Sequence, residues 1–248
     1  MGNSFVDGKP LIKEVLSKSE LVIFESVEDK NESVVNVMLN RADDFSYREL
    51  LYKEDVAFLD DYTKDWKVPL SKQKPGELII KLQQEIIKEK CETVKSTDTS
   101  DHMDDYLQEL AEKQNISISG LETYDDQMKV ISTNPADKEE FTWENSKNII
   151  HQFILDAKTK DKKRQKQICD LATNYMKMKL DYQLNAKCAE NDEMLSKRNE
   201  RWMPKIKQSI EENNSIFIAV GLYHLYGECG VISQLIKDGY EVKPVKLK

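Results

Sequence analysis

The sequence predicts a mixed α/β protein, rich in helices, in which helices flank a central β-sheet core and a large helical segment occupies the middle of the chain. Two apolar runs with the length of buried strands lie near opposite ends of the sequence, at Leu21–Phe24 and Ser215–Val220. Glycine and proline are scarce, at 8 and 6 of 248 residues, so long helices should dominate. Strands at both ends and a helical middle favour a single domain over residues 1–248, with a helical insertion at about 137–212.

Charge and hydropathy argue against two classes of protein. The chain carries 45 acidic and 37 basic residues, a net charge of −8, whereas a protein that binds phosphate backbones needs a net basic face. The longest apolar run, Ile216–Val220, is far shorter than the roughly 20 residues that cross a bilayer. The first ten residues lack the basic and apolar regions of a signal peptide. We therefore expect no nucleic-acid partner and no membrane span in this chain, and the oligomeric state stays open.

The cysteines predict no cross-links. Cys91, Cys169, Cys188 and Cys229 are scattered along the chain, and no two of them form a CxxC pair. A disulfide framework is not expected in a chain of this size, and ligation of a metal by thiolates needs closer spacing. The sequence therefore predicts four unrelated free thiols.

Each element follows from the spacing of apolar residues and from the residues that cap or interrupt it. Asp101 is the expected cap of one helix, Pro204 a kink or restart within another, and Gly239 the left-handed end of the last. The predicted strands are Leu21–Phe24, Ile116–Leu121, Ser215–Val220 and Tyr240–Val245. The predicted helices are Pro10–Ser19, Val34–Leu39, Tyr47–Tyr62, Glu77–Lys90, Asp101–Lys113, Tyr124–Ile131, Asp137–Lys160, Arg164–Leu184, about 191–212 and Glu228–Lys237.

Three predicted strands end in residues that can carry chemistry. Glu25 follows the first strand, Glu122 follows the second, and His224 follows the strand that begins at Ser215, in a turn framed by Gly221 and Gly227. Ligands of open α/β sheets bind outside the carboxyl ends of strands. If the three strands are neighbours, the side chains converge as a general acid/base or hard-metal site. Taken singly, the histidine could instead bond a backbone group, and each glutamate could cap a helix or remain solvated.

Two arginines lie near the start of a helix that precedes the histidine strand. The helix dipole does not favour Arg198 and Arg201 at this position. Their presence indicates a specific carboxylate or anion partner. The alternative for either arginine is an ion pair on the surface.

Several stretches resemble the TraB/GumN (TraB/PrgY) family. RNERWMPKI, followed by FIAVGLYHLYGECGVISQLIKDGYEVKPV, resembles the family's closing signature of an RN helix, an apolar strand and G-x-x-H-L-x-G. GLETYDDQ, residues 120–127, resembles its GLET…Q element, and LVIFES, residues 21–26, resembles its early strand. The family is similar to a wider group that contains the Tiki proteases, erythromycin-esterase-like proteins and ChaN-like haem-binding lipoproteins. That likeness implies a core of two sheets flanked by helices.

The resemblance also implies a set of site residues. Tiki-type proteases depend on a metal, so a divalent metal ion held by His224 and Glu25 is expected. The implied catalytic residues are His224, Glu25, Glu122 and either Arg198 or Arg201. The implied substrate-binding residues are Gly221, Tyr223, Gly227 and Gln127.

One part of the family pattern is not found in the sequence. The first of two G-x-x-H motifs should lie on a strand before the first helix, whereas MGNSFVDGKPLIKEVL resembles the segment that follows that motif. The chain could be a truncated form or a pseudoenzyme, and the uninterrupted match favours truncation. A full-length form would then be expected to be secreted, periplasmic or a lipoprotein.

Three functions follow as hypotheses. The first is a metal-dependent, peptidase-like hydrolase, weakened in this chain because one histidine is missing. The second is a protein that sequesters a peptide or small ligand without turning it over. The third is a helical interaction domain that uses Asp137–Leu184 as its partner surface.

Overall fold

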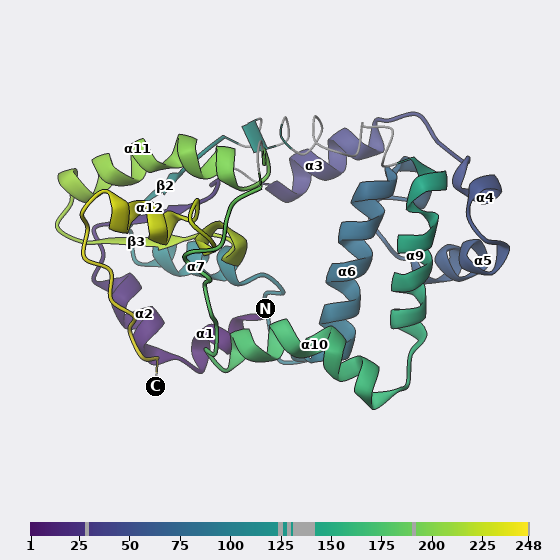
Figure 1. The fold of residues 1–248 in the computed structure, drawn as a ribbon, viewed down its shortest axis with the longest axis horizontal. Helices are drawn as coiled ribbons and strands as arrows, with labels where there is room; N and C mark the ends of the chain where they lie inside the picture. Colours follow the sequence, from purple (N-terminus) through teal and green to yellow (C-terminus); the bar gives the residue numbers. More distant parts are fainter. Residues whose placement is uncertain (28–29, 124–125, 128–129, 131–141, 190–191, 248) are drawn as a thin grey trace. The chain divides into compact units, whose positions relative to one another are not determined.

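The computed structural model, drawn in Figure 1, describes residues 1–27, 30–123, 126–127, 130, 142–189 and 192–247. The chain forms two compact units. The first comprises Met1–Glu28, Val94–Val130 and Asn174–Lys248, and the second comprises Asp29–Thr93 and Ile131–Thr173. Among the described residues, no helix has the length and apolarity that crossing a membrane requires. The single domain over residues 1–248 stays a prediction.

A parallel sheet forms the centre of the first unit. Its strands are β1 (Leu21–Phe24), β2 (Ser117–Gly120) and β3 (Ile216–Ala219), in the order β2-β1-β3. Phe24, the last residue of β1, lies opposite Gly120 on one side and Ala219 on the other. All three strands therefore end at the same level, and whatever follows them meets at one edge. The predicted mixed α/β class is confirmed.

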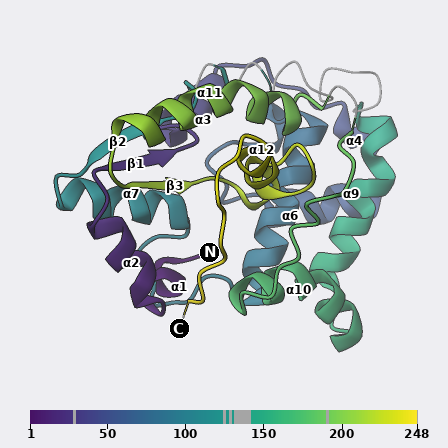
Figure 2. The same ribbon diagram turned by 60° about the vertical axis from the view of Figure 1, so that its left-hand side comes forward.

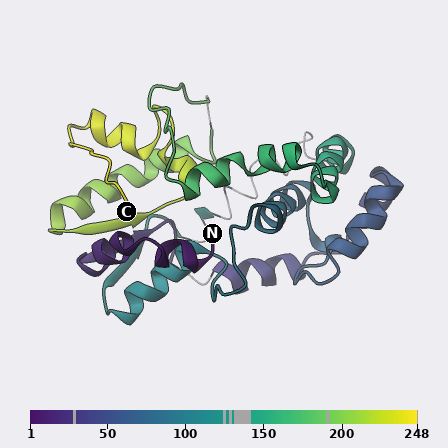
Figure 3. The same cartoon turned by 90° about the horizontal axis from the view of Figure 1, so that it is seen from below.

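Helices cover both faces of this sheet because side chains alternate along β1. Val22 and Phe24 point to one face, where α1 (Asn3–Asp7), α2 (Pro10–Ser17) and α7 (Met103–Lys113) pack. Ile23 points to the other face, where it is buried with residues of α11 (Ser196–Glu212) and α12 (Val231–Lys237). Figures 2 and 3 show the sheet between these two helical layers.

The helix α11 (Ser196–Glu212) owes its position to one buried stripe. Trp202, Met203 and Ile206 pack on the sheet together with Val231 of α12 (Val231–Lys237). Arg198 is also buried on α11, one helical turn before Trp202. The packing of the apolar residues thus carries a charged side chain into the interior.

The second unit is helical. Its elements are α3 (Lys30–Leu39), α4 (Tyr47–Leu50), α5 (Lys53–Tyr62), the 3₁₀ turn η1 (Leu70–Lys72), α6 (Pro75–Cys91), α9 (Trp143–Lys158) and most of α10 (Lys162–Met176). Figure 1 shows α6 and α9 side by side. Leu78, Leu82 and Ile86, at helical spacing on α6, share one core with Ile150 and Ile154 of α9.

Most predicted elements are confirmed, although several bounds are wrong. β1 has the predicted bounds, and β2 and β3 are each one residue shorter at both ends. The predicted helix over Tyr47–Tyr62 is two helices, because Leu51 and Tyr52 are extended. The N-cap of α7 is His102 rather than Asp101. Gly239 is left-handed, as predicted, and part of the helix predicted over Tyr124–Ile131 lies outside the described residues.

Two predictions in the second half of the chain are wrong. Residues 240–247 form no strand, since the alternating apolar residues there have no face to cover, and Val242 and Val245 are exposed. The helix predicted over Arg164–Leu184 ends at Met176, and Met178 adopts a left-handed backbone that an α-helix cannot contain. Pro204 lies inside α11, which continues to Glu212.

The prediction of four free thiols is also wrong. Cys91, the last residue of α6, is bridged to Cys169 of α10 across a Cα–Cα distance of 5.3 Å. Cys188 is bridged to Cys229, with a Cα–Cα distance of 6.0 Å. The partners lie 78 and 41 residues apart in sequence, so no local spacing could have indicated either pair. Only the fold brings them together.

We predict that protein purified without reductant contains both bridges. After denaturation it should show no reactive thiol, and peptide mapping should recover Cys91 linked to Cys169 and Cys188 linked to Cys229. Reduction should lower the free energy of unfolding by up to about 4 kcal/mol for each bridge, because each closes a long loop of the unfolded chain. The Cys91→Ser/Cys169→Ser variant is the control that removes one bridge alone. Four reactive thiols in the unreduced protein would contradict the pairing.

Candidate functional site

The three strand ends bring two carboxylates and a histidine to one edge of the sheet. Glu25 directly follows β1, and Glu122 lies two residues beyond β2. His224 lies in the 3₁₀ turn η4 (Leu222–Leu225) that follows β3. The side-chain exposures are 18% for Glu25 and 4% for both Glu122 and His224. These groups come from distant parts of the sequence and meet because the strands are parallel and in register.

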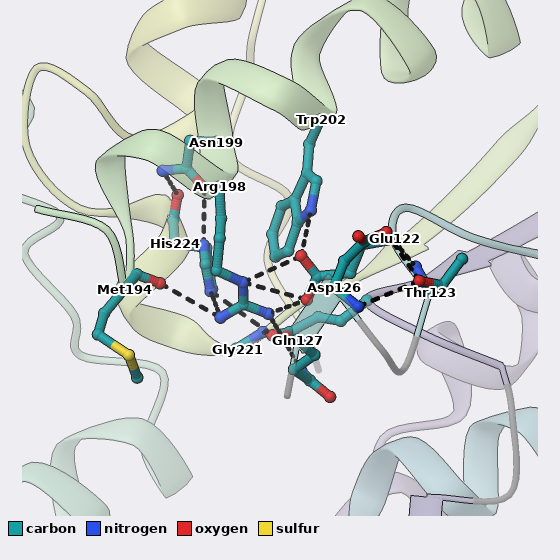
Figure 4. Close-up of polar contacts among 11 residues, drawn as sticks. Glu122, Thr123, Asp126, Gln127, Met194, Arg198, Asn199, Trp202, Gly221 and His224 are labelled. Carbon is teal, nitrogen blue, oxygen red and sulfur yellow. Dashed lines mark hydrogen bonds and ion pairs between the residues drawn. The ribbon is translucent and has the colours of Figure 1, made fainter. Parts of the chain in front are cut away.

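Arg198 lies among these groups and uses every one of its N–H groups. Its Nη2 contacts Glu25 Oε2 at 2.7 Å and Glu122 Oε1 at 2.5 Å. Its Nε lies 3.1 and 3.2 Å from the two oxygens of Glu122. Its Nη1 donates to the carbonyl of Met194 at 3.2 Å and lies 3.1 Å from His224 Nε2. Figure 4 shows the guanidinium between His224 and Glu122.

The energetics of this cluster rest on charge pairing. The side chain of Arg198 is only 7% exposed, and a buried charge without partners is strongly destabilising. A planar guanidinium offers five donors in a fixed fork, and a carboxylate offers two acceptor oxygens. Two carboxylates and two neutral acceptors, the carbonyl of Met194 and Nε2 of His224, therefore satisfy the arginine completely. The cluster is a consequence of burying Arg198 rather than a set of surface ion pairs.

Further donors hold the two carboxylates in place. The N–H of Gly221 donates to Glu25 Oε1 at 2.7 Å, and Gln127 Nε2 donates to Glu25 Oε2 at 3.2 Å. Trp202 Nε1 donates to Glu122 Oε2 at 3.1 Å. A Cβ atom at position 221 would lie 2.9 Å from Glu25 Oε1. Glycine at this position therefore allows the close approach of backbone and carboxylate.

The protonation states follow from burial and from these neighbours. Burial on its own would raise the pKa of Glu25. The positive charge that His224 acquires in acid, the N–H of Gly221 and the guanidinium of Arg198 together outweigh burial, so this pKa lies below its ordinary value. Burial would lower the pKa of Arg198, but the bond to Glu122 and the charges of both carboxylates raise it.

His224 is neutral at physiological pH. Burial lowers its pKa to about 4, and the charge of Arg198 acts in the same direction, while Glu25 opposes both. Its Nδ1 lies 2.7 Å from Asn199 Oδ1, and its ring lies 4.2 Å from that of Trp202, centroid to centroid. The site thus combines an ionised carboxylate, a permanent cation and a neutral imidazole.

Three predicted residues do not join the cluster. The side chain of Arg201 is 50% exposed and pairs with Glu193 at 3.8 Å, so Arg198 rather than Arg201 is the arginine of the cluster. Tyr223 is 55% exposed and contacts Tyr226, with ring centroids 6.0 Å apart. Gly227 has a φ of +71° and packs against the carbonyl of Ala186, beside the cluster rather than in it.

Sequence reasoning missed Asn199 and Trp202. Arg198, Trp202 and Ile206 follow one another at intervals of four on α11, and Asn199 precedes Met203 by the same interval. All of these residues are buried. Polar residues on the apolar stripe of an amphipathic helix were the available signal. That signal would also have separated Arg198 from Arg201.

The described residues do not provide a set of metal ligands. No group of three histidine, cysteine, aspartate or glutamate side chains among them could hold an ion. Nε2 of His224 and Oε2 of Glu25 both face Arg198, so the donor atoms expected for a metal are satisfied by a guanidinium. The expected divalent ion therefore does not fit the arrangement of these side chains.

These observations define a parallel α/β protein with a buried Arg–Glu–Glu–His cluster at the carboxyl edge of its sheet. The model of the TraB/PrgY/gumN family matches residues 2–244, nearly the whole chain, and the protein belongs to this family. Comparison with curated proteins and with solved structures gives no match. Family membership confirms the sequence-based resemblance. The wider Tiki-like group and the missing first motif stay predictions.

The two arginines of α11 give a direct test of the cluster. We predict that Arg198→Met lowers the free energy of unfolding by about 3–5 kcal/mol, because it leaves two buried carboxylates without their cation. Arg201→Met, on the same helix, should cost less than about 1 kcal/mol, as is usual for an exposed pair. Urea denaturation of both variants at pH 7 measures the difference. Equal losses in the two variants would contradict the cluster.

The lowered pKa values predict loss of stability in acid. Between about pH 6.5 and pH 4, the unfolded chain protonates His224 while the folded chain does not, so the free energy of unfolding decreases as the pH falls. The full difference is roughly 3 kcal/mol for a shift of this size. Glu25 acts in the same direction at lower pH, because its folded carboxylate stays ionised longer than the unfolded one.

Urea denaturation at pH 7, 6 and 5 tests this expectation. The decrease in the free energy of unfolding between pH 7 and pH 5 should be clearly smaller in His224→Gln than in the wild type. An identical decrease in the two proteins would show that His224 titrates normally in the folded state.

Proposed function

We propose that this protein is a hydrolase that cleaves a peptide-type amide bond at the carboxyl edge of the sheet, with Glu25 and His224 at the reacting centre. One observation carries the proposal: all three strands of the parallel sheet end in members of the same cluster. Ligands of open α/β sheets bind at such an edge, and groups with shifted pKa values gather at functional sites. The peptide-type substrate comes from the resemblance to Tiki-type proteases.

Glu25 has the properties of the residue that meets water. It is the most exposed member of the cluster, and its lowered pKa keeps it ionised at neutral pH. The N–H of Gly221 and the guanidinium of Arg198 fix the direction of its carboxylate. His224 Nε2 lies 3.9 Å from Glu25 Oε1, so the histidine is the second group placed to hold or move a proton.

Arg198 and Glu122 have the properties of supporting residues. Each N–H of Arg198 already has an acceptor, and both oxygens of Glu122 accept from Arg198 or Trp202. A role for Arg198 in stabilising an oxyanion would require one of these bonds to break. Within the proposed hydrolase, the pair therefore positions Glu25 and His224. The expected metal ion also remains a proposal, since it would have to displace the guanidinium from the same two residues.

A second function has one observation in its favour. Every N–H group of the guanidinium already has an acceptor, which is the arrangement expected of a cluster that does not rearrange when a ligand binds. A protein that binds a peptide or small ligand without cleaving it would need only this stable framework. Turnover is the measurement that separates the two functions.

We predict that Glu25→Gln lowers peptide hydrolysis at least 100-fold, because the amide keeps the shape of the side chain but cannot accept a proton. Glu20→Gln is the matched control. Glu20 directly precedes β1, whereas Glu25 directly follows it. The carboxylate of Glu20 accepts hydrogen bonds from Asn214 at the opposite end of the strand from the cluster. Cleavage of a defined peptide mixture by wild type and both variants can be followed by mass spectrometry, with chelator and with added Mn²⁺ or Zn²⁺ as separate arms.

The outcomes are distinct. Equal rates for wild type and Glu25→Gln remove Glu25 from the mechanism. Cleavage that requires added metal and stops with chelator would favour a metal-dependent site despite the poor fit. Saturable binding of the same peptides without cleavage in any arm would favour the second function.

A further inference from the structure

We propose that Asn199 is a positioning residue that holds His224 in the tautomer protonated on Nδ1, which leaves Nε2 as a proton acceptor facing Arg198 and Glu25. The catalytic consequence rests on the proposed hydrolase, whereas the tautomer rests on geometry alone. Asn199 belongs to the RN element of the family resemblance, which implies no role for it, and strand-end reasoning did not point to it. The inference comes from the orientation of one buried amide.

The amide of Asn199 has only one orientation that satisfies its surroundings. Its Nδ2 lies 2.8 Å from the carbonyl oxygen of Cys229 and 3.2 Å from that of His224. Both neighbours are acceptors only, so the nitrogen side of the amide must face them. Its Oδ1 then faces the imidazole, 2.7 Å from Nδ1 of His224. An amide oxygen cannot donate, and Nδ1 must therefore carry the proton.

The other ring nitrogen leads independently to the same tautomer. Nε2 of His224 lies 3.1 Å from Nη1 of Arg198. A guanidinium can only donate, so Nε2 must present its lone pair. Two different groups on opposite sides of the ring therefore require one state. The tautomer of a histidine is set in this way by the bond that each nitrogen makes.

The surroundings keep both ring and amide from rotating. His224 and Asn199 are 3% and 2% exposed, so water cannot replace either partner. The ring of Trp202 packs against the imidazole, with a centroid distance of 4.2 Å and an angle of 34° between the ring planes. The carbonyl of Cys229 also accepts from Gln234 Nε2 at 2.8 Å, and Cys229 is bridged to Cys188. The acceptor that orients Asn199 is thus itself fixed.

The tautomer can be read directly by NMR. Two-bond proton–nitrogen correlation spectra of protein labelled with ¹⁵N-histidine report which ring nitrogen carries the proton. The chain has three histidines, and His224→Gln identifies the signals of His224. At pH 7 we expect a neutral ring protonated on Nδ1 in the wild type, whereas a histidine in water favours the proton on Nε2.

Variants test whether Asn199 is the cause. Asn199→Leu keeps the branched shape of the side chain but removes the acceptor for Nδ1, which leaves Arg198 as the one group that sets the tautomer. The fraction of rings protonated on Nδ1 should therefore fall, and kcat should fall 10–100-fold with little change in KM. Asn199→Asp keeps an acceptor for Nδ1 and should retain the tautomer while raising the pH at which His224 titrates. Asn213→Leu is the control. It removes a side-chain hydrogen bond from Asn213 to the carbonyl of Ser209 at the end of α11, and it should change neither the tautomer nor kcat.

The possible results separate the two proposals. A wild-type ring protonated on Nε2 overturns the inference without the need for any variant. An Asn199→Leu protein that keeps both the Nδ1 proton and the wild-type kcat also overturns it. A ring protonated on Nδ1 in a protein without hydrolase activity would support the positioning role of Asn199 and reject the proposed function.

Discussion

A buried guanidinium is the constraint on which the rest of the first unit depends. Arg198 enters the interior because it shares the stripe of α11 that includes Trp202 and Ile206. Its charge then requires carboxylates at fixed positions, and the chain supplies them from the ends of two different strands. The ion cluster thereby ties α11 to β1 and β2 at a defined register. Apolar packing alone would tolerate small shifts of the helix, whereas the forked contacts of a guanidinium do not.

The parallel register is the second requirement. Each residue of a strand advances the chain by about 3.3 Å, so a slip of one residue would carry Glu122 out of reach of the arginine. The same slip would also turn the side chains of β2 to the opposite face of the sheet. The pairing of Phe24 with Gly120 and Ala219 therefore determines both the hydrophobic layers and the polar cluster. The packing of the first unit and the geometry of the candidate site therefore both depend on the register of the parallel strands.

The sequence predicted what depends on local pattern. The strand Leu21–Phe24 was found because four apolar residues are bounded by polar ones, and the convergence of Glu25, Glu122 and His224 followed from their place after strands. The disulfides could not be predicted from the sequence, because the paired cysteines meet only in the folded chain. The closing strand was wrong because an alternating pattern predicts a strand only when a sheet edge and an apolar surface receive it. Catalytic and binding roles of the clustered residues stay predictions.

The saturation of Arg198 also determines from which side a ligand could reach the site. Glu122 accepts hydrogen bonds from the guanidinium of Arg198 and the indole N–H of Trp202 and is almost completely buried, so releasing it would leave a charge without solvent. Glu25 is several times more exposed, and its contact with Gln127 is a neutral-amide bond of 3.2 Å. His224 Nε2 receives its bond as a neutral acceptor, which costs less to exchange than an ion pair. A ligand should therefore enter over Glu25 and leave the pair of Arg198 and Glu122 intact as the fixed base of the site.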